Sequence, residues 1–118
     1  MKRLFEELMQ TVGISGVVVL TLKGQILHQS YLDSELEERL SDAFLHQFID
    51  TLGIVHEADI IFSRRLVYMR RFPMGFLLVF MLPNAPMAMV RLQIDTLIPQ
   101  LEASTKVKGL KRFFKLRK

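Results

Sequence analysis

Apolar and polar positions follow two periods along the chain, and each period predicts one kind of secondary structure. Apolar side chains three and four residues apart predict a first helix over residues 2–12, ended by Gly13. A last helix with the same spacing begins near Pro86, where a missing N–H costs nothing. Pro99 lies well inside it and removes a hydrogen bond, so we expect a kink or an early end near Ile98.

The middle helix has the clearest pattern, over about residues 35–52. Ser34 and Glu37 have the spacing of a capping box, in which each side chain accepts a hydrogen bond from a backbone N–H at the helix start. Apolar side chains then recur at intervals of four, which predicts one buried stripe. The stripe consists of Leu36, Leu40, Phe44, Phe48 and Leu52.

Short β-branched and aromatic runs predict five strands. The runs 17–22 and 25–32 are joined by Lys23-Gly24, which predicts a hairpin with a two-residue turn. Three more runs follow the middle helix, and the last of them is apolar on both faces, as expected of a central strand. These runs cover about residues 58–64, 65–72 and 75–82. The order predicts an α+β fold: a five-stranded antiparallel sheet with helices on both faces.

This order of elements, with the glycines and turns that separate them, resembles the roadblock family, named for a dynein light chain. The matching features are Gly13-x-x-Gly16, the Lys23-Gly24 turn and the Gly75 strand, besides the capped middle helix and the long last helix. The resemblance covers about residues 3–103 and is greatest to bacterial and archaeal members of the mutual gliding protein B type. It implies first and third helices on one face of the sheet and the second on the other. Members usually dimerise through third strands and second helices. Many bind Ras-like GTPases, some bacterial ones stimulate GTP hydrolysis, and others are scaffolds.

Carried over by position, the dimer interface would involve helix 35–52 and strand 58–64. The apolar character of that strand supports this independently, because an unpaired apolar edge invites pairing. The residues expected at the interface are Leu36, Leu40, Phe44, Phe48, Ile60, Ile61 and Phe62.

The charge is divided unevenly along the chain. Residues 105–118 hold seven of the 16 Lys and Arg and no acid, whereas the other 104 residues carry nine basic and 12 acidic side chains. We therefore divide the chain into a roadblock-like domain, residues 1–104, and a basic amphipathic tail, residues 105–118. Such a tail suits an anionic membrane or an acidic protein better than nucleic acid, or it is merely solvated. Its expected contact residues are Lys108, Lys111, Arg112, Phe113, Phe114 and Lys115.

Catalytic patterns are absent from the sequence. There is no cysteine, which excludes disulfides and thiolate chemistry, and there is no phosphate-binding loop or nucleophile elbow. His28, His46 and His56 lack metal-ligand spacing. We expect no enzyme activity, no cofactor and no metal, in a protein that is cytoplasmic or peripheral at the inner face of the membrane.

Four arginines flank the segment Leu66-Val67-Tyr68-Met69, namely Arg64, Arg65, Arg70 and Arg71. Neighbouring strand residues point to opposite faces, so the four cannot form one patch. They either pair with acids across strands or supply one arginine to a GTPase and its phosphates. The sequence thus indicates a non-catalytic homodimer that binds and regulates a Ras-like GTPase. The alternatives are a peripheral membrane scaffold targeted by the tail and a small-ligand sensor.

Overall fold

The computed structural model describes residues 2–32, 42–52, 55–62 and 64–116. Within these ranges lie three α-helices, one 3₁₀ helix and five strands. In chain order they are η1 (Lys2–Phe5), α1 (Glu6–Met9), β1 (Ile14–Thr21), β2 (Ile26–Tyr31), α3 (Asp42–Leu52), β3 (Glu57–Phe62), β4 (Arg65–Phe72), β5 (Gly75–Met81) and α4 (Met87–Leu116). The predicted capping box of Ser34 and Glu37 lies outside the described residues.

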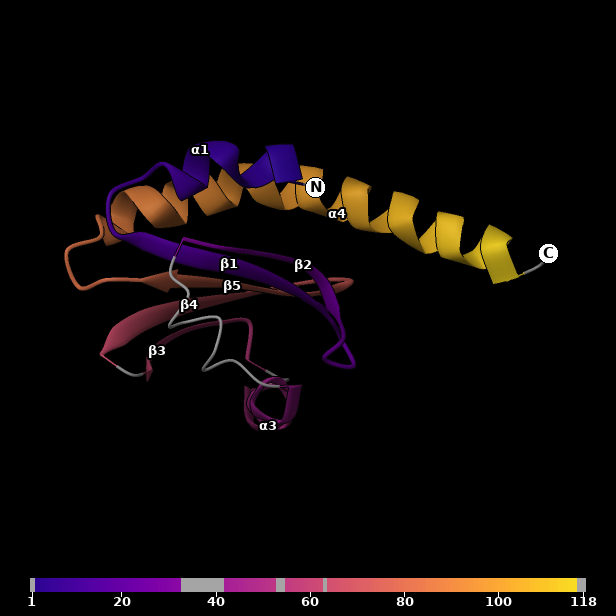
Figure 1. Cartoon of the computed structure of the whole chain (residues 1–118), viewed down its shortest axis with the longest axis horizontal. Coiled ribbons are helices and arrows are strands. Elements are labelled where there is room, and N and C mark those ends of the chain that lie inside the picture. The colour runs from indigo at the N-terminus through magenta and orange to yellow at the C-terminus, as the bar shows by residue number, and fades with distance from the viewer. Residues whose placement is uncertain (1, 33–41, 53–54, 63, 117–118) are drawn as a thin grey trace.

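All five strands form one antiparallel sheet in the order β2-β1-β5-β4-β3. The doubly apolar strand β5 is central and buried along its whole length, as predicted. Figure 1 shows η1, α1 and α4 on one face of the sheet and α3 on the other. The α+β class and the helix arrangement expected from the roadblock resemblance are therefore both confirmed.

Each face of the sheet carries its own hydrophobic core. On the α4 face, Val90, Ile94 and Leu101 are completely buried against the sheet, together with residues of η1 and α1. On the α3 face, Leu45 and Phe48 pack against alternate residues of β1, β4 and β5. Burial of a large apolar side chain contributes about 1.5–3 kcal/mol, so these two layers supply most of the drive to fold.

The hairpin between β1 and β2 differs from the prediction in its turn. Thr21 N donates to Gln25 O over 2.8 Å, and Gly24 N donates to Thr21 O over 3.0 Å. These bonds enclose three loop residues rather than two. Gly24 has a φ of 87°, which glycine adopts without strain, and it occupies the last place of a three-residue hairpin loop.

A β-bulge follows in β2 at Leu27. Val19 pairs with His28 while Leu20 pairs with Ile26, so no residue of β1 pairs with Leu27. Regular alternation would place Leu27 and His28 on opposite faces. Because of the extra residue, both face α4: Leu27 packs against that core, and the His28 ring stacks on Phe5 with centroids 5.3 Å apart.

Gly13 ends the N-terminal helical segment with a φ of 88°, as its predicted C-cap role requires. A Cβ there would lie 2.8 Å from the Cα of Ala85, at the approach to α4. The Gly13 carbonyl also accepts a 2.7 Å hydrogen bond from Leu82 N. This glycine therefore joins the first helical segment to the connection between β5 and α4.

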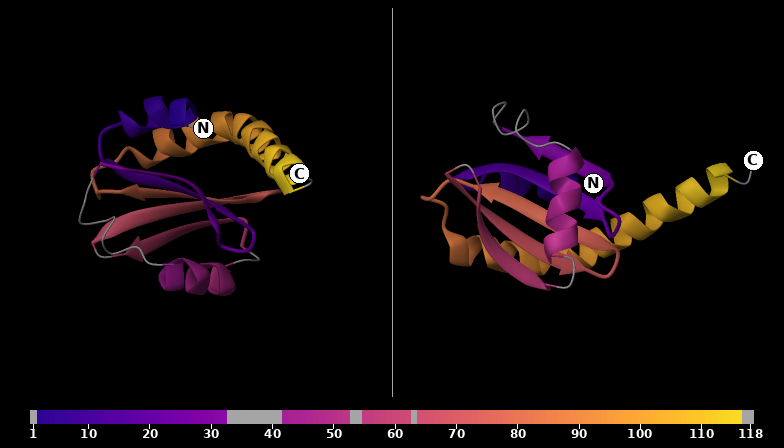
Figure 2. Two further views of the ribbon diagram at one scale, coloured as in Figure 1. Left: turned by 45° about the vertical axis from the view of Figure 1, so that its right-hand side comes forward. Right: turned by 90° about the horizontal axis from the view of Figure 1, so that it is seen from below.

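Of the two outcomes expected at Pro99, a kink or an early end near Ile98, the early end is wrong. α4 continues through Pro99 to Leu116, and Figures 1 and 2 show it bent, convex on the side away from the sheet. Pro99 is exposed, whereas Leu101 and Thr105 beyond it are buried. The lost hydrogen bond thus falls on the solvent side, where the freed carbonyl is open to hydration, and buried contacts hold the helix on both sides of the proline.

Candidate functional site

The sheet has two edge strands, β2 and β3, and they differ in regularity. The bulge at Leu27 interrupts β2, and such an irregular edge resists addition of a further strand. β3 instead pairs with β4 in unbroken register from Glu57 to Phe62. The prediction that this strand lies at an edge is confirmed, and its regularity makes it the better template for a partner.

The backbone of β3 presents alternate residues to the open edge. Arg71 N donates to His56 O over 2.8 Å, which makes these two residues a hydrogen-bonded pair of the β3–β4 ladder. Such pairs alternate in an antiparallel ladder, so Ala58 and Ile60 also direct their backbone groups toward β4. It follows that the outer row of donors and acceptors belongs to Glu57, Asp59 and Ile61.

The side chains of β3 divide between the two faces. Ala58 and Ile60 pack against the core on the α3 face. Glu57, Asp59 and Ile61 lie on the α4 face, and Ile61 is 79% exposed, more than any other large hydrophobic side chain in the described part of the chain. The open edge therefore combines an apolar position at one end with two acids at the other.

The predicted interface residues fall into three groups. Ile60 is partly buried and Ile61 is exposed, both at the β3 edge, whereas Phe48 is 8% exposed and buried in the protomer's own core. Phe44 belongs to α3 and Phe62 to β3, but their side chains are not described. Leu36 and Leu40 lie outside the described residues. β3 and α3 nevertheless share one face and one core, as an interface built from both elements requires.

Arg91 of α4 reaches across to the edge strand. Its Nη2 donates to Asp59 Oδ2 over 2.5 Å, and its Nε lies 3.6 Å from Glu57 Oε1. The guanidinium also lies over the Tyr68 ring, 5.7 Å from the centroid. Sequence reasoning missed this residue because 32 positions separate Arg91 from Asp59 and no local pattern links them.

Tyr68 continues the same polar network behind the edge. Its hydroxyl donates to Glu57 Oε1 over 2.5 Å and accepts a 3.3 Å hydrogen bond from Arg70 Nη1, which also binds Asp95 Oδ1 over 2.6 Å. Burial, followed by the hydrogen bond to Glu57, raises the pKa of Tyr68 to about 12. Tyr68 is therefore a permanent hydrogen-bond donor at neutral pH, and it fixes the Glu57 carboxylate beside Arg91.

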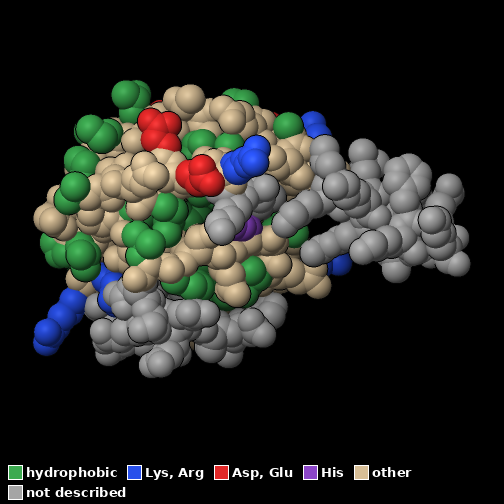
Figure 3. Space-filling model, turned by 45° about the horizontal axis from the view of Figure 1, so that its top comes forward, with side chains coloured by type: hydrophobic (Ala, Val, Ile, Leu, Met, Phe, Trp, Pro, Cys, Tyr) green, Lys and Arg blue, Asp and Glu red, His purple; other side chains and the backbone are tan. Residues whose placement is uncertain are grey.

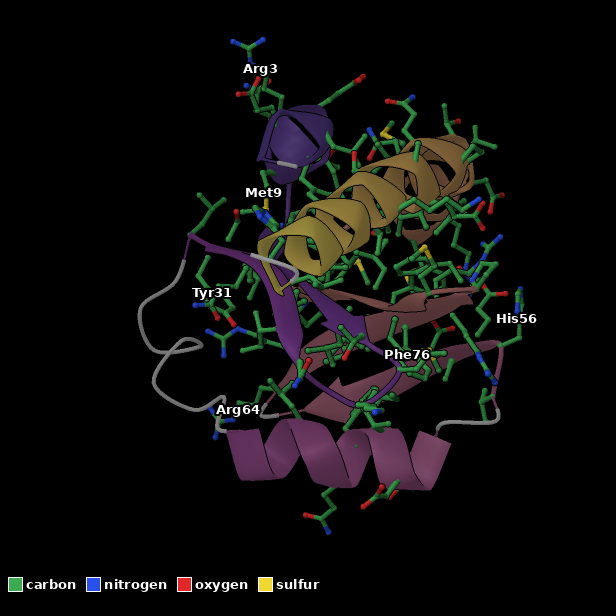
Figure 4. The ribbon with its side chains drawn as sticks, turned by 90° about the vertical axis from the view of Figure 1, so that its right-hand side faces the viewer. Arg3, Met9, Tyr31, His56, Arg64 and Phe76 are labelled. Carbon is green, nitrogen blue, oxygen red and sulfur yellow. The ribbon has the colours of Figure 1, made fainter. Side chains whose placement is uncertain are left out.

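The four clustered arginines do not form one patch, as predicted. Arg70 lies on the α4 face in the ion pair with Asp95, whereas the Arg71 guanidinium lies 5.9 Å from the centroid of Phe76, on the α3 face. Figure 4 shows Phe76 directed toward α3, with His56 at the margin of the sheet that carries β3. Arg65 is 8% exposed, and Arg64, with a φ of 66° at the turn between β3 and β4, is exposed.

A second exposed apolar region lies where α4 begins. Leu82 and Met89 are 43% and 53% exposed, and Val12 beside them is 67% exposed. Leu92 adds a further exposed side chain one turn along α4. Hydrophobic side chains gather at this end of the molecule in the space-filling view (Figure 3).

The basic tail continues α4 as a helix. The helical backbone crosses position 104 without a break and extends beyond the sheet (Figures 1 and 2). The side chains from Val107 onward are not described, so the expected tail contacts stay a prediction. Among the described residues, no helix combines the length and the apolar character needed to cross a bilayer.

Two surface grooves flank α1, but neither gathers catalytic groups. One, of about 320 Å³, lies between the N-terminal helical segment and α4, and the other, of about 400 Å³, lies between α1 and the end of β2. His28 is hydrogen-bonded to Ser30 over 2.9 Å. The described residues contain no cluster of three metal-ligating side chains.

No protein-family model matches the chain, and no curated protein matches it by sequence. Solved structures do resemble it. The Roadblock/LC7 domain from Streptomyces avermitilis superposes with a TM-score of 0.65 at 14% identity, covering 90% of this chain and 94% of that one. MglC from Myxococcus xanthus gives 0.67 at 19%, covering 87% and 97%. An MglB with a tetrameric arrangement gives 0.67 at 15%, covering 85% and 83%. The fold is thus the roadblock fold.

Proposed function

We propose that this protein is a non-catalytic, homodimeric interaction module that binds and regulates a Ras-like small GTPase. The observation that carries the proposal is the β3 edge, which is regular, carries the exposed Ile61 and directs an outer row of backbone groups to solvent. The shared fold supports it, since one structural neighbour is an MglB described in a tetrameric arrangement. The GTPase itself comes from the roadblock resemblance.

The alternation along β3 suits a symmetric pair. Residues that lie directly opposite each other in an antiparallel pair have their side chains on the same face of the sheet. Two copies therefore keep both α3 helices on one face only when odd-numbered residues of one β3 lie opposite odd-numbered residues of the other. The outer row of Glu57, Asp59 and Ile61 is odd-numbered throughout. Pairing about a two-fold axis therefore satisfies these groups and joins two five-stranded sheets into one.

Charge selects the register within that pairing. An axis at Asp59 would set this carboxylate opposite its own copy, which is unfavourable because like charges directly opposite each other repel. An axis at Ile60 sets Asp59 opposite Ile61, and an axis at Ile61 sets the two Ile61 side chains together. We place the axis at one of these two isoleucines.

Light scattering behind size-exclusion chromatography tests the dimer. The full chain is expected at twice 13.7 kDa, and Ile61→Lys is expected to be a monomer because a charge replaces the exposed apolar contact. Leu32→Lys is the matched control: this leucine is 67% exposed and follows β2, at the opposite edge of the sheet, so the variant stays dimeric. A dimeric I61K variant would move the interface away from β3.

Arg64 is the arginine of the four that we assign to the GTPase. It is exposed at the turn that follows β3, so it lies at the end of the paired strands, and its planar fork suits oxyanions. Pull-down with Ras-like GTPases in both nucleotide states tests this. We expect enrichment in one state and its loss in Arg64→Ala. Equal background in both states for the wild-type dimer would count against GTPase binding.

A second candidate, a peripheral membrane scaffold, is favoured by one observation: the α4 backbone stays helical as far as Leu116, within the basic tail. Each basic residue near an anionic surface contributes about 1 kcal/mol. Full-length protein is then expected to sediment with phosphatidylserine vesicles. Substitution of Lys108, Lys111 and Lys115 by Glu should abolish this, and unchanged sedimentation of that variant would exclude the tail as the anchor.

A further inference from the structure

The side chains on the open edge of β3 include charges that would disfavour the proposed pairing. Two of its three outward residues, Glu57 and Asp59, are acids whose side chains are 41% and 45% exposed. Charged side chains on an edge strand ordinarily prevent pairing, because an incoming strand must bring its own charges close to them. With both carboxylates uncompensated, this edge would be protected against a second copy of the same chain.

Arg91 halves the negative charge that gives this protection. It contacts both carboxylates at once, at 2.5 Å from Asp59 Oδ2 and 3.6 Å from Glu57 Oε1. Tyr68 holds the arrangement in place, since its ring lies beneath the guanidinium and its hydroxyl donates to Glu57. The three charges then sum to −1 in place of the −2 of the acids alone.

We infer that Arg91 is the positioning residue that makes the β3 edge fit to pair with a second copy of this chain. The inference rests on the proposed homodimer and adds what controls it: the charge of the edge strand is set from α4, a separate element on the face of the sheet. An edge without Arg91 favours a partner strand rich in Lys or Arg, whereas an edge with Arg91 favours its own copy.

In a symmetric pair of β3 strands, the charge compensation by Arg91 acts once in each copy. With the axis at Ile60, the two Asp59 residues are diagonal neighbours, and diagonal Cα atoms lie roughly 7–8 Å apart in an antiparallel pair. One Asp59 carboxylate from each copy then lies beside the axis, and each Glu57 lies two residues further from the axis along its own strand. Two Arg91 side chains bridge them within their own copies, and each is 45% exposed, so the interaction is open to screening by salt.

Sedimentation equilibrium of full-length variants tests the inference. Arg91→Ala is expected to raise the dimer dissociation constant about tenfold at low salt, with the gap to the wild type closing at high salt. Arg91→Lys keeps the charge and should lie between the two. Adding Glu57→Gln and Asp59→Asn to R91A should restore the wild-type constant, which a merely structural role of Arg91 would not do.

Asp95→Asn is the matched control. Its carboxylate lies one turn further along the same helix and pairs with Arg70 of β4, so the dissociation constant should not change. Equal constants for R91A and the wild type, or no restoration in the triple variant, would overturn the inference while leaving the homodimer standing. A monomeric wild type would instead remove the proposed homodimer and this inference with it.

Discussion

Arg70 and Asp95 form an ion pair, with 2.6 Å between Nη1 and Oδ1, that joins β4 to α4 one helical turn beyond Arg91. The arginine is 21% exposed and the aspartate 55% exposed. The hydrogen bond to Tyr68 is the main cause that raises the pKa of Arg70, followed by that to Asp95. Two bridges, one turn apart, therefore connect the same helix to the same margin of the sheet.

Loss of the outer partner of this pair should cost little. Asp95 is more than half exposed, and exposed ion pairs contribute at most about 1 kcal/mol. We expect D95N to lower the free energy of unfolding by less than about 1 kcal/mol in urea titrations. A larger loss would mean that Asp95 positions α4 on the sheet as well as neutralising Arg70.

Removal of the Tyr68 hydroxyl should cost more, because it leaves Glu57 without its 2.5 Å donor. We expect Tyr68→Phe to lower the free energy of unfolding by about 1–2 kcal/mol at neutral pH. Urea titration of both proteins measures this. An unchanged midpoint would show that water replaces the hydroxyl as the donor to Glu57.

The same tyrosine predicts a loss of stability at alkaline pH. Its pKa is raised from 10.0 to about 12 in the folded chain, so the folded state holds the phenolic proton more tightly than the unfolded state does. Its contribution is complete below 10.0 and falls as the pH rises toward 12. Thermal midpoints should drop more steeply for the wild type than for Y68F across that interval. Parallel curves would contradict this assignment.

Gly75 should tolerate no side chain. A Cβ there would lie 1.9 Å from the Leu20 carbonyl oxygen, a backbone atom of the paired strand β1. We expect Gly75→Ala to destabilise the protein by at least about 3 kcal/mol, since β1 and β5 must separate at the centre of the sheet. Gly109→Ala is the control: its backbone is helical in α4, where alanine is about 1 kcal/mol better than glycine.

Pro99 should be a position where the chain gains stability. It is exposed inside a continuous helix, so alanine would restore one backbone hydrogen bond without disturbing a buried contact. We expect Pro99→Ala to raise the free energy of unfolding by about 1–3 kcal/mol. Thermal unfolding followed by circular dichroism measures the change. A loss of stability would mean that the bend itself is needed for the far half of α4 to pack.

Elements with a strong local pattern were predictable from the sequence. β5 is apolar on both faces and lies in the centre, and the stripe through Val90, Ile94 and Leu101 faces the sheet. In each case the pattern lies in residues close together in the chain, because burial from solvent applies to a whole face of a helix or strand.

Features that depend on register or on distant contacts were not predictable. The extra residue at Leu27 and the three-residue loop before it are set by the pairing of β1 with β2, which the periodicity of one strand does not reveal. Pro99 is tolerated because contacts beyond it hold the helix. Arg91 meets Asp59 only after three strands and a helix are in place. The wrong turn length and the wrong helix end share this cause.

The bulge at Leu27 sets a limit to assembly. A sheet with two regular margins can accept a neighbour on each, and repeated addition then yields a fibre of unlimited length. Here the β2 margin is irregular and only the β3 margin offers a continuous row. In the proposed homodimer, association through sheet margins therefore ends after one pairing event, because the irregularity at Leu27 disfavours a second one on the opposite margin.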